Sequence, residues 1–297
     1  MRKKLRRILW AAAALVAVLT GGLYAADELG PQRELTADTA VHFIDVGQGD
    51  SALLLSGGQA VLIDAGTAES GAAVVRYLEE LGVTELYGAV ATYPHADHIG
   101  GMAQVIEAFP IEHFYLGPET QNTATYSGML DALEEAGVQP VIPADGDELV
   151  FDSGASLTFL GPADDVPKSN LNDRSLITLF RAGDQDVLFM GDAESAAEES
   201  LLAHHPALTC DVLKVGHHGA ATSSSEEFLQ AVRPSTAVIS CGVDNDYGHP
   251  SDQTLQNLSL AGVDDVRITA QSGTVVLPLN PPSSSSEENA ALNRPVL

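Results

Sequence analysis

The feature that most constrains the fold is a repeated alternation of two kinds of segment. Short apolar runs typical of β-strands are followed by amphipathic runs typical of helices, in two similar halves. Between about residues 40 and 280, no low-complexity linker or block of like charge interrupts the alternation. A sheet flanked by helices buries its apolar faces against them. We therefore predict one layered α/β domain of about 240 residues.

The boundaries of these elements follow from turn residues and from helical spacing. The predicted strands are residues 41–46, 51–55, 60–63, 87–91, 112–116, 139–142, 156–160, 176–181, 186–190, 212–215, 236–240, 266–269 and 274–277. The predicted helices are residues 72–81, 99–108, 126–136, 193–204, 226–232 and 252–261.

The composition excludes some partners and some kinds of metal site. The chain carries 41 Asp and Glu against 14 Lys and Arg, a net charge of −27. Nucleic-acid binding by phosphate neutralisation needs clustered Lys and Arg. Because acidic residues far outnumber basic ones in this chain, we expect no such basic patch. A metal-dependent enzyme acting on a phosphodiester is not excluded. With only Cys210 and Cys241, paired or as free thiols, any metal site must use His and carboxylate ligands.

The two ends of the sequence differ from the body. Residues 2–7 contain five basic side chains and precede an apolar run at residues 8–19. This pattern is typical of a signal peptide or a signal anchor. We therefore predict that residues 1–35 export the protein, which is then secreted or anchored to the outer face of the cytoplasmic membrane. Residues 281–297 are polar and are predicted to form a disordered tail.

Histidine and aspartate recur where predicted strands give way to helices. The residues at these five junctions are Asp64; His95, Asp97 and His98; Asp192; His217 and His218; and His249. The carboxyl ends of strands are where layered α/β proteins bind ligands. Each motif alone has a simpler explanation, for example Asp192 capping the next helix. Their recurrence at one kind of position favours a shared site for Zn²⁺ or a similar cation.

The order of these motifs resembles the metallo-β-lactamase superfamily. The motifs are I-D-A-G at 63–66, H-x-D-H-x-G-G at 95–101, G-D at 191–192, H-H-G at 217–219 and G-H-P at 248–250. Within the superfamily, the hydrolase domain of ComEC-like competence proteins is similar in D-V-G-Q-G-D at 45–50, the Asn172/Ser175 stretch, K-V-G-H-H-G at 214–219 and Y-G-H-P at 247–250. The resemblance spans about residues 41–277 and implies a four-layer αββα sandwich with a metal cluster along one edge.

The resemblance also implies a ligand set for one or two ions, Zn²⁺ or else Mn²⁺. One ion would be held by Asp97, His98, His249 and a bridging Asp192. The other would be held by His95, Asp192, His217 or His218, and the residue at position 93. Relatives usually have His at that position, whereas this chain has Tyr93. A phenol is neutral near pH 7 and is a poorer ligand than imidazole, which weakens the second site.

The chemistry of a bound metal suggests catalytic roles for some of these residues and for their neighbours. A bound divalent ion lowers the pKa of its water and polarises a substrate oxygen. The expected catalytic residues are Asp97, Asp192, Lys214 and His218. The expected substrate contacts are Asn172 and Ser175, which would otherwise only shape a turn. Asp45, Asp50 and Asp64 are expected to support the ligand loops by hydrogen bonds.

The sequence thus predicts an exported metal-dependent hydrolase that acts on a phosphodiester, with DNA as one candidate. Two alternatives stay open. One is a hydrolase of a lactone or another small ester. The other is a non-catalytic binding module that has lost its metal because Tyr93 replaces the first histidine. Membrane contact is expected only through the N-terminal segment.

Overall fold

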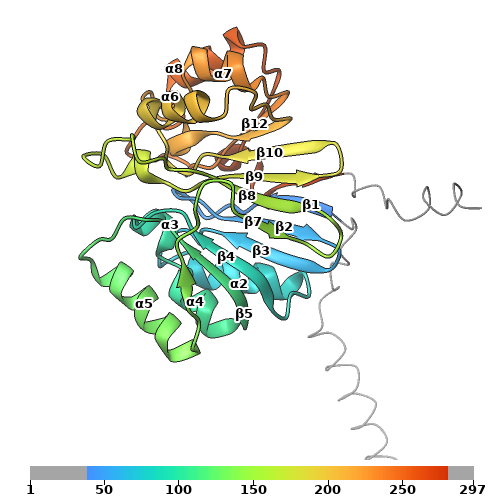
Figure 1. Cartoon of the computed structure of the whole chain (residues 1–297), viewed down its shortest axis with the longest axis vertical. Coiled ribbons are helices and arrows are strands. Elements are labelled where there is room, and N and C mark those ends of the chain that lie inside the picture. The colour runs from blue at the N-terminus through green and yellow to red at the C-terminus, as the bar shows by residue number, and fades with distance from the viewer. Residues whose placement is uncertain (1–38, 280–297) are drawn as a thin grey trace, which may run out of the picture.

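The computed structural model describes residues 39–279, so the predicted export segment (1–35) and polar tail (281–297) lie outside the described residues. Two seven-stranded sheets pack face to face, and helices cover the outer side of each (Figure 1). The predicted four-layer αββα sandwich is confirmed. Within residues 39–279, no helix is long and apolar enough to cross a membrane.

The first sheet has the strand order β14-β1-β2-β3-β4-β5-β6. Its strands are β1 (Thr39–Phe43), β2 (Ala52–Ser56), β3 (Gln59–Ile63), β4 (Leu86–Ala91), β5 (Ile111–Leu116), β6 (Pro140–Val141) and β14 (Val275–Pro278). Pairing is antiparallel from β14 to β3 and parallel from β3 to β6. The helices between its parallel strands are α2 (Gly71–Glu80), α3 (Ala96–Ile99), α4 (Met102–Ala108) and α5 (Ala124–Ala136).

The second sheet repeats this plan with the order β13-β12-β11-β10-β9-β8-β7. Its strands are β7 (Glu148–Val150), β8 (Ser156–Gly161), β9 (Ile177–Ala182), β10 (Gln185–Phe189), β11 (Val212–Lys214), β12 (Thr236–Ile239) and β13 (Asp265–Ile268). Pairing is antiparallel from β7 to β10 and parallel from β10 to β13. The helices of this half are α6 (Ser195–His204), α7 (Glu226–Val232), α8 (Asp252–Leu260) and the short α9 (Thr269–Ser272).

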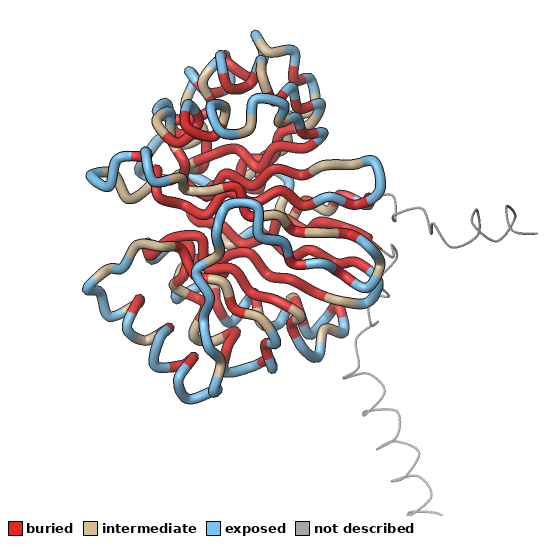
Figure 2. The backbone as a smooth tube through the Cα atoms, in the orientation of Figure 1, coloured by how far each residue is buried: buried red, intermediate tan, exposed pale blue. Residues whose placement is uncertain are grey.

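Three apolar layers hold the sandwich together, one between the sheets and one under each set of helices. In β2, Leu54 faces the other sheet whereas Leu53 and Leu55 face the helices, because successive side chains of a strand point to opposite faces. Figure 2 shows the strands buried along most of their length. Burial on both faces explains why the strands are continuous apolar runs in the sequence.

Two of the differences between the predicted and the observed elements have a clear physical reason. The predicted helix 99–108 is divided into α3 and α4 at Gly100 and Gly101, where a side chain would collide with the backbone of Ala96 or Ala65. The strand β7 was not predicted, because three residues, of which only Leu149 is buried, are too few to show a periodic pattern in the sequence. Both cysteines are buried free thiols.

Replacement of an inter-sheet leucine tests this layered core. We expect Leu54→Ala, at a fully buried position, to lower the free energy of unfolding by about 2–5 kcal/mol. The control Leu260→Ala removes the same atoms from a side chain that is 60% exposed and should change it by less than about 0.5 kcal/mol. Urea denaturation of both variants measures the difference, and equal losses would contradict the assignment of Leu54 to the inter-sheet layer.

Candidate metal centre

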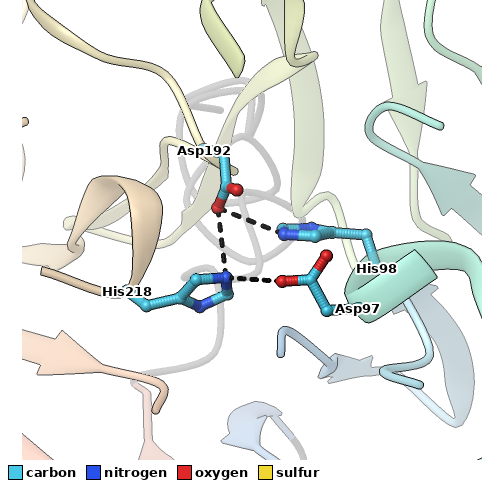
Figure 3. Close-up of side chains that lie close together, drawn as sticks. All are labelled: Asp97, His98, Asp192 and His218. Atoms are coloured by element: carbon cyan, nitrogen blue, oxygen red, sulfur yellow. Dashed lines mark hydrogen bonds and ion pairs between the residues drawn. The ribbon is translucent and has the colours of Figure 1, made fainter. Parts of the chain in front are cut away.

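Four side chains from distant parts of the chain converge where the parallel strands of both sheets end. Asp97 and His98 belong to α3 after β4, Asp192 follows β10, and His218 follows β11. One ligand atom from each lies within 4.8 Å of all the others. Figure 3 shows the four side chains turned toward a common point.

The distances between these atoms suit a divalent cation. His98 Nε2 lies 3.1 Å from Asp192 Oδ1, and His218 Nε2 lies 3.4 Å from the same oxygen and 3.1 Å from Asp97 Oδ2. Two ligands of a tetrahedral zinc, each bonded at about 2.1 Å, lie about 3.4 Å apart. Both His98 Nε2 and Asp192 Oδ1 are buried without a hydrogen-bond partner. Each of the two atoms instead faces other side chains of the group, so a cation bound among them would satisfy both.

The orientation of His98 is set by Asp64. Asp64, which has a positive φ of 56°, accepts hydrogen bonds from Thr92 N at 2.8 Å and from Thr92 Oγ1 at 2.6 Å. It also lies 2.7 Å from His98 Nδ1. A ligating imidazole is commonly held through its other nitrogen in this way. Asp64 therefore lies behind His98 and leaves Nε2 free to face Asp192. Thr92 was missed by the sequence analysis, although it directly precedes the motif.

The orientation of His218 depends on an unusual turn. His217 and His218 have φ values of 45° and 55°, in the left-handed region that non-glycine residues seldom occupy. This turn places His218 Nδ1 2.9 Å from the Ser240 carbonyl and 3.2 Å from Asp50 Oδ1. His218 Nε2 consequently faces Asp97 and Asp192.

An ion pair lies directly beneath the centre. Lys214 Nζ donates to Asp50 Oδ2 at 2.6 Å, and both side chains are buried. Burial alone would raise the pKa of Asp50, but Lys214 and His218 lower it to about 2. Lys214, which we expected to be a catalytic residue, is only 3% exposed. The structure places it as the counter-ion of Asp50, on the buried side of the centre.

A second group of side chains faces the other oxygen of Asp192. The Tyr93 hydroxyl donates to Asp192 Oδ2, and His217 Nε2 lies 3.7 Å from the same atom. The ring of His95 lies 4.6 Å from that of Tyr93. Burial and then the charges of Asp192 and Asp97 raise the pKa of Tyr93 well above its usual value. Tyr93 therefore stays a neutral phenol, and its hydroxyl donates a hydrogen bond to Asp192 Oδ2. We call the side of Asp192 that carries Oδ2 its second face.

The structure groups His218, and not His249, with Asp97 and His98. The ring of His249 lies beyond the four side chains, 6.2 Å from that of His218 and 5.5 Å from that of His217. The left-handed turn at residues 217–218 brings His218 Nε2 to 3.1 Å from Asp97 Oδ2, and the group of four close ligand atoms does not include His249. The Nδ1 atom of His249 is nevertheless buried without a hydrogen-bond partner.

The remaining predicted residues support the loops around the centre. Ser175 is fully buried, where its Oγ accepts a hydrogen bond from Asp192 N at 3.1 Å and donates to Asn172 O at 2.8 Å. Asn172 Nδ2 lies 3.4 Å from His217 Nε2. Asp45 accepts from Gly47 N at 3.1 Å on the exposed side of the neighbouring loop.

Glu194 is a further residue that the sequence analysis missed. It lies 2.7 Å from His217 Nδ1, and it accepts hydrogen bonds from Thr222 at 2.7 Å and Asn170 at 2.7 Å. The hydrogen bond from His217 is the main reason why the pKa of Glu194 is lowered to about 2. Its position two residues after Asp192, on the same junction loop, was the available signal.

A four-layer αββα sandwich with histidines and aspartates clustered at one edge defines a metal-binding protein of the metallo-β-lactamase fold. Residues 44–243 match the sequence model of the Metallo-beta-lactamase superfamily, and the chain belongs to this superfamily. Its solved structural relatives include the metallo-beta-lactamase fold protein YhfI from Bacillus subtilis, with a TM-score of 0.55 at 14% identity over 81% of this chain and 99% of that one. At such low identity this likeness supports the fold alone.

The predicted resemblance to ComEC-like competence proteins is confirmed. The chain is 30% identical over 259 residues to ComE operon protein 3 of Bacillus subtilis, a match that covers 81% of this chain and 33% of that protein. It is 31% identical over 253 residues to Competence protein ComA of Neisseria gonorrhoeae, covering 84% and 33% respectively. The chain therefore spans about a third of the length of these relatives.

A double-mutant cycle tests the ion pair between Lys214 and Asp50. Lys214→Met should lower the free energy of unfolding by about 3–5 kcal/mol, because it leaves Asp50 charged, buried and without its lysine partner. The double variant Lys214→Met/Asp50→Leu should recover much of that loss, since it removes both charges. Denaturant unfolding of the parent, the two single variants and the double variant gives the coupling energy. Strictly additive effects would contradict the pairing.

Proposed function

We propose that the chain is a hydrolase that cleaves a phosphodiester with one divalent metal held by Asp97, His98, Asp192 and His218. The convergence of these donors carries the proposal, since His98 Nε2 and Asp192 Oδ1 are buried and contact only one another and His218. When bound, such an ion lowers the pKa of water and polarises an oxygen of the substrate. Zn²⁺ suits this mixed set of imidazoles and carboxylates, and Mn²⁺ is the alternative.

The residues of the centre divide by exposure. His98, Asp192 and His218 are each 0–1% exposed at the side chain and fix the geometry, whereas Asp97 is 31% exposed. Asp97 is thus the carboxylate that solvent and substrate reach, and it is placed to accept a proton from the attacking water. His217, 23% exposed and held by Glu194, borders the same open side. It is placed to donate a hydrogen bond to a substrate oxygen.

The choice of substrate rests on the family resemblance. Similarity to competence proteins favours a phosphodiester, with DNA as one candidate. A lactone or another small ester is the rival substrate, and a metal-free binding module is the rival class. Export is also part of the proposal, because a basic and then apolar segment precedes the domain in the sequence.

Metal content tests the proposal directly. Protein purified without added metal should contain about one equivalent of a divalent ion by inductively coupled plasma mass spectrometry. His98→Ala and Asp192→Asn should lose it, because each removes a ligand atom. His205→Ala is the control, since His205 pairs with Asp145 on the surface. Chelation should lower the Tm of the parent and the control only. A parent without stoichiometric metal would overturn the enzyme hypothesis.

Activity assays on the same proteins separate the substrate classes. The metal-loaded parent should hydrolyse bis(p-nitrophenyl) phosphate and a short oligonucleotide, and His98→Ala and Asp192→Asn should be at least about 100-fold slower. Hydrolysis of a lactone panel in place of both phosphodiesters would favour the ester alternative.

Substitution of Tyr93 tests the second face of Asp192. Tyr93→His should raise the metal content from one toward two equivalents, because an imidazole nitrogen would replace a phenol beside His95 and His217. Tyr93→Phe removes the hydroxyl without supplying a ligand, so its content should stay at one. Equal metal content in the Tyr93→His variant and the parent would contradict this interpretation of the second face.

A further inference from the structure

The loop between β12 and α8 presents two exposed apolar side chains beside the candidate centre. Tyr247 is 72% exposed and Val243 is 70% exposed, the highest values among the exposed large hydrophobic residues of the described chain, 39–279. Neither side chain takes part in the proposed metal centre. What sets Tyr247 apart from Val243 is its place beside His249, whose ring neighbours those of His217 and His218.

The loop is closed at its base by hydrogen bonds. Asn245 Nδ2 donates to the carbonyl oxygens of Gly242 at 2.9 Å and of His249 at 2.6 Å. Asn245 Oδ1 accepts from His249 N at 2.9 Å, and Gly242 N donates to Gln48 Oε1 at 3.1 Å. These bonds fix the path of the backbone, so the exposed Tyr247 projects from a supported turn.

A row of rings connects Tyr247 to the centre. The Tyr247 ring is nearly parallel to that of His249, with 5.6 Å between centroids and an interplanar angle of 22°. The His249 ring in turn lies 6.2 Å from that of His218, whose Nε2 is one of the four donors. Because Tyr247 is mostly exposed, the face of its ring that is turned away from His249 is open to solvent.

The negative charge of the chain limits the kinds of ligand that the exposed face of the Tyr247 ring can bind. The chain carries a net charge of −27, and Lys214 is already paired with Asp50. Neither the overall charge nor this lysine therefore helps to neutralise a polyanion. Stacking of a base on an aromatic ring needs no positive charge and suits every base. It does need an exposed base face, which a base inside a duplex does not offer.

We propose that Tyr247 is a stacking platform for an unpaired base next to the phosphodiester at the metal centre. The substrate class is then single-stranded nucleic acid. This inference rests on the proposed function, which places a phosphodiester at Asp97, His98, Asp192 and His218. Tyr247 acts here as a substrate-binding residue and not as a group that takes part in bond cleavage.

The test compares three variants of the full, metal-loaded chain on two oligomers. The oligomers are a short oligothymidylate and the same sugar-phosphate chain without bases. The variants are Tyr247→Ala, Tyr247→Phe and the control Val243→Ala, which truncates an equally exposed side chain of the same loop. The readouts are kcat and KM for cleavage, and Kd from fluorescence anisotropy with labelled phosphorothioate forms of both oligomers, which are cleaved slowly. Thermal unfolding checks that each variant is folded.

We expect Tyr247→Ala to raise both KM and Kd for oligothymidylate by about tenfold, with kcat within about twofold of the parent. Tyr247→Phe and Val243→Ala should stay close to the parent. The oligomer without bases should bind the parent about tenfold more weakly, and Tyr247→Ala should not weaken it further.

Two results would overturn the stacking role. One is an unchanged Kd in Tyr247→Ala, and the other is an equal loss for both oligomers, which would assign Tyr247 to the sugar-phosphate backbone. Failure of the proposed function looks different. In that case the parent would cleave neither oligomer nor bis(p-nitrophenyl) phosphate, while the Kd comparison would still decide whether Tyr247 binds a base.

Discussion

The buried ion pair between Lys214 and Asp50 is the interaction on which the rest of the candidate centre depends. Asp50 belongs to the loop between β1 and β2 of the first sheet, and Lys214 ends β11 of the second. The pair therefore joins the two sheets at the edge where the ligand loops lie. A buried charge is tolerated only with a partner. Asp50 meets this condition with Lys214 on one oxygen, while its other oxygen faces His218.

The other buried carboxylates of the centre also have partners of opposite charge. Three buried carboxylates, Asp50, Asp64 and Asp192, are surrounded by Lys214, His98 and His218. Burial by itself would lower the pKa of His98, but Asp192 and Asp64 raise it well above the usual value. The Tyr93 hydroxyl donates a hydrogen bond to Oδ2 of Asp192. These contacts favour the proposed one-metal site over a second metal site beside Tyr93.

A strongly acidic protein with this centre has few ways to hold a phosphodiester. The proposed metal attracts the phosphate locally, and the proposed stacking on Tyr247 adds binding energy that does not depend on surface charge. Binding through one metal and one stacked base would be less sensitive to salt than binding through many Lys and Arg contacts. In this proposal the metal ligands position the phosphate, and Tyr247 binds the neighbouring base.

The layered fold and the general position of the centre could be predicted from local sequence patterns. Strands buried on both faces are continuous apolar runs, and the motifs at their carboxyl ends contain Asp97, His98, Asp192 and His218 within a recognisable order. Which histidine joins Asp97 and His98 depends on the packing of the two sheets, since His218 lies 121 positions away from Asp97 and reaches it through a left-handed turn. The same packing pairs Lys214 with Asp50, buries Ser175 and brings Glu194 to His217. The physical reason is that local patterns specify strands, helices and their junctions, whereas contacts across two packed sheets depend on how the completed layers meet.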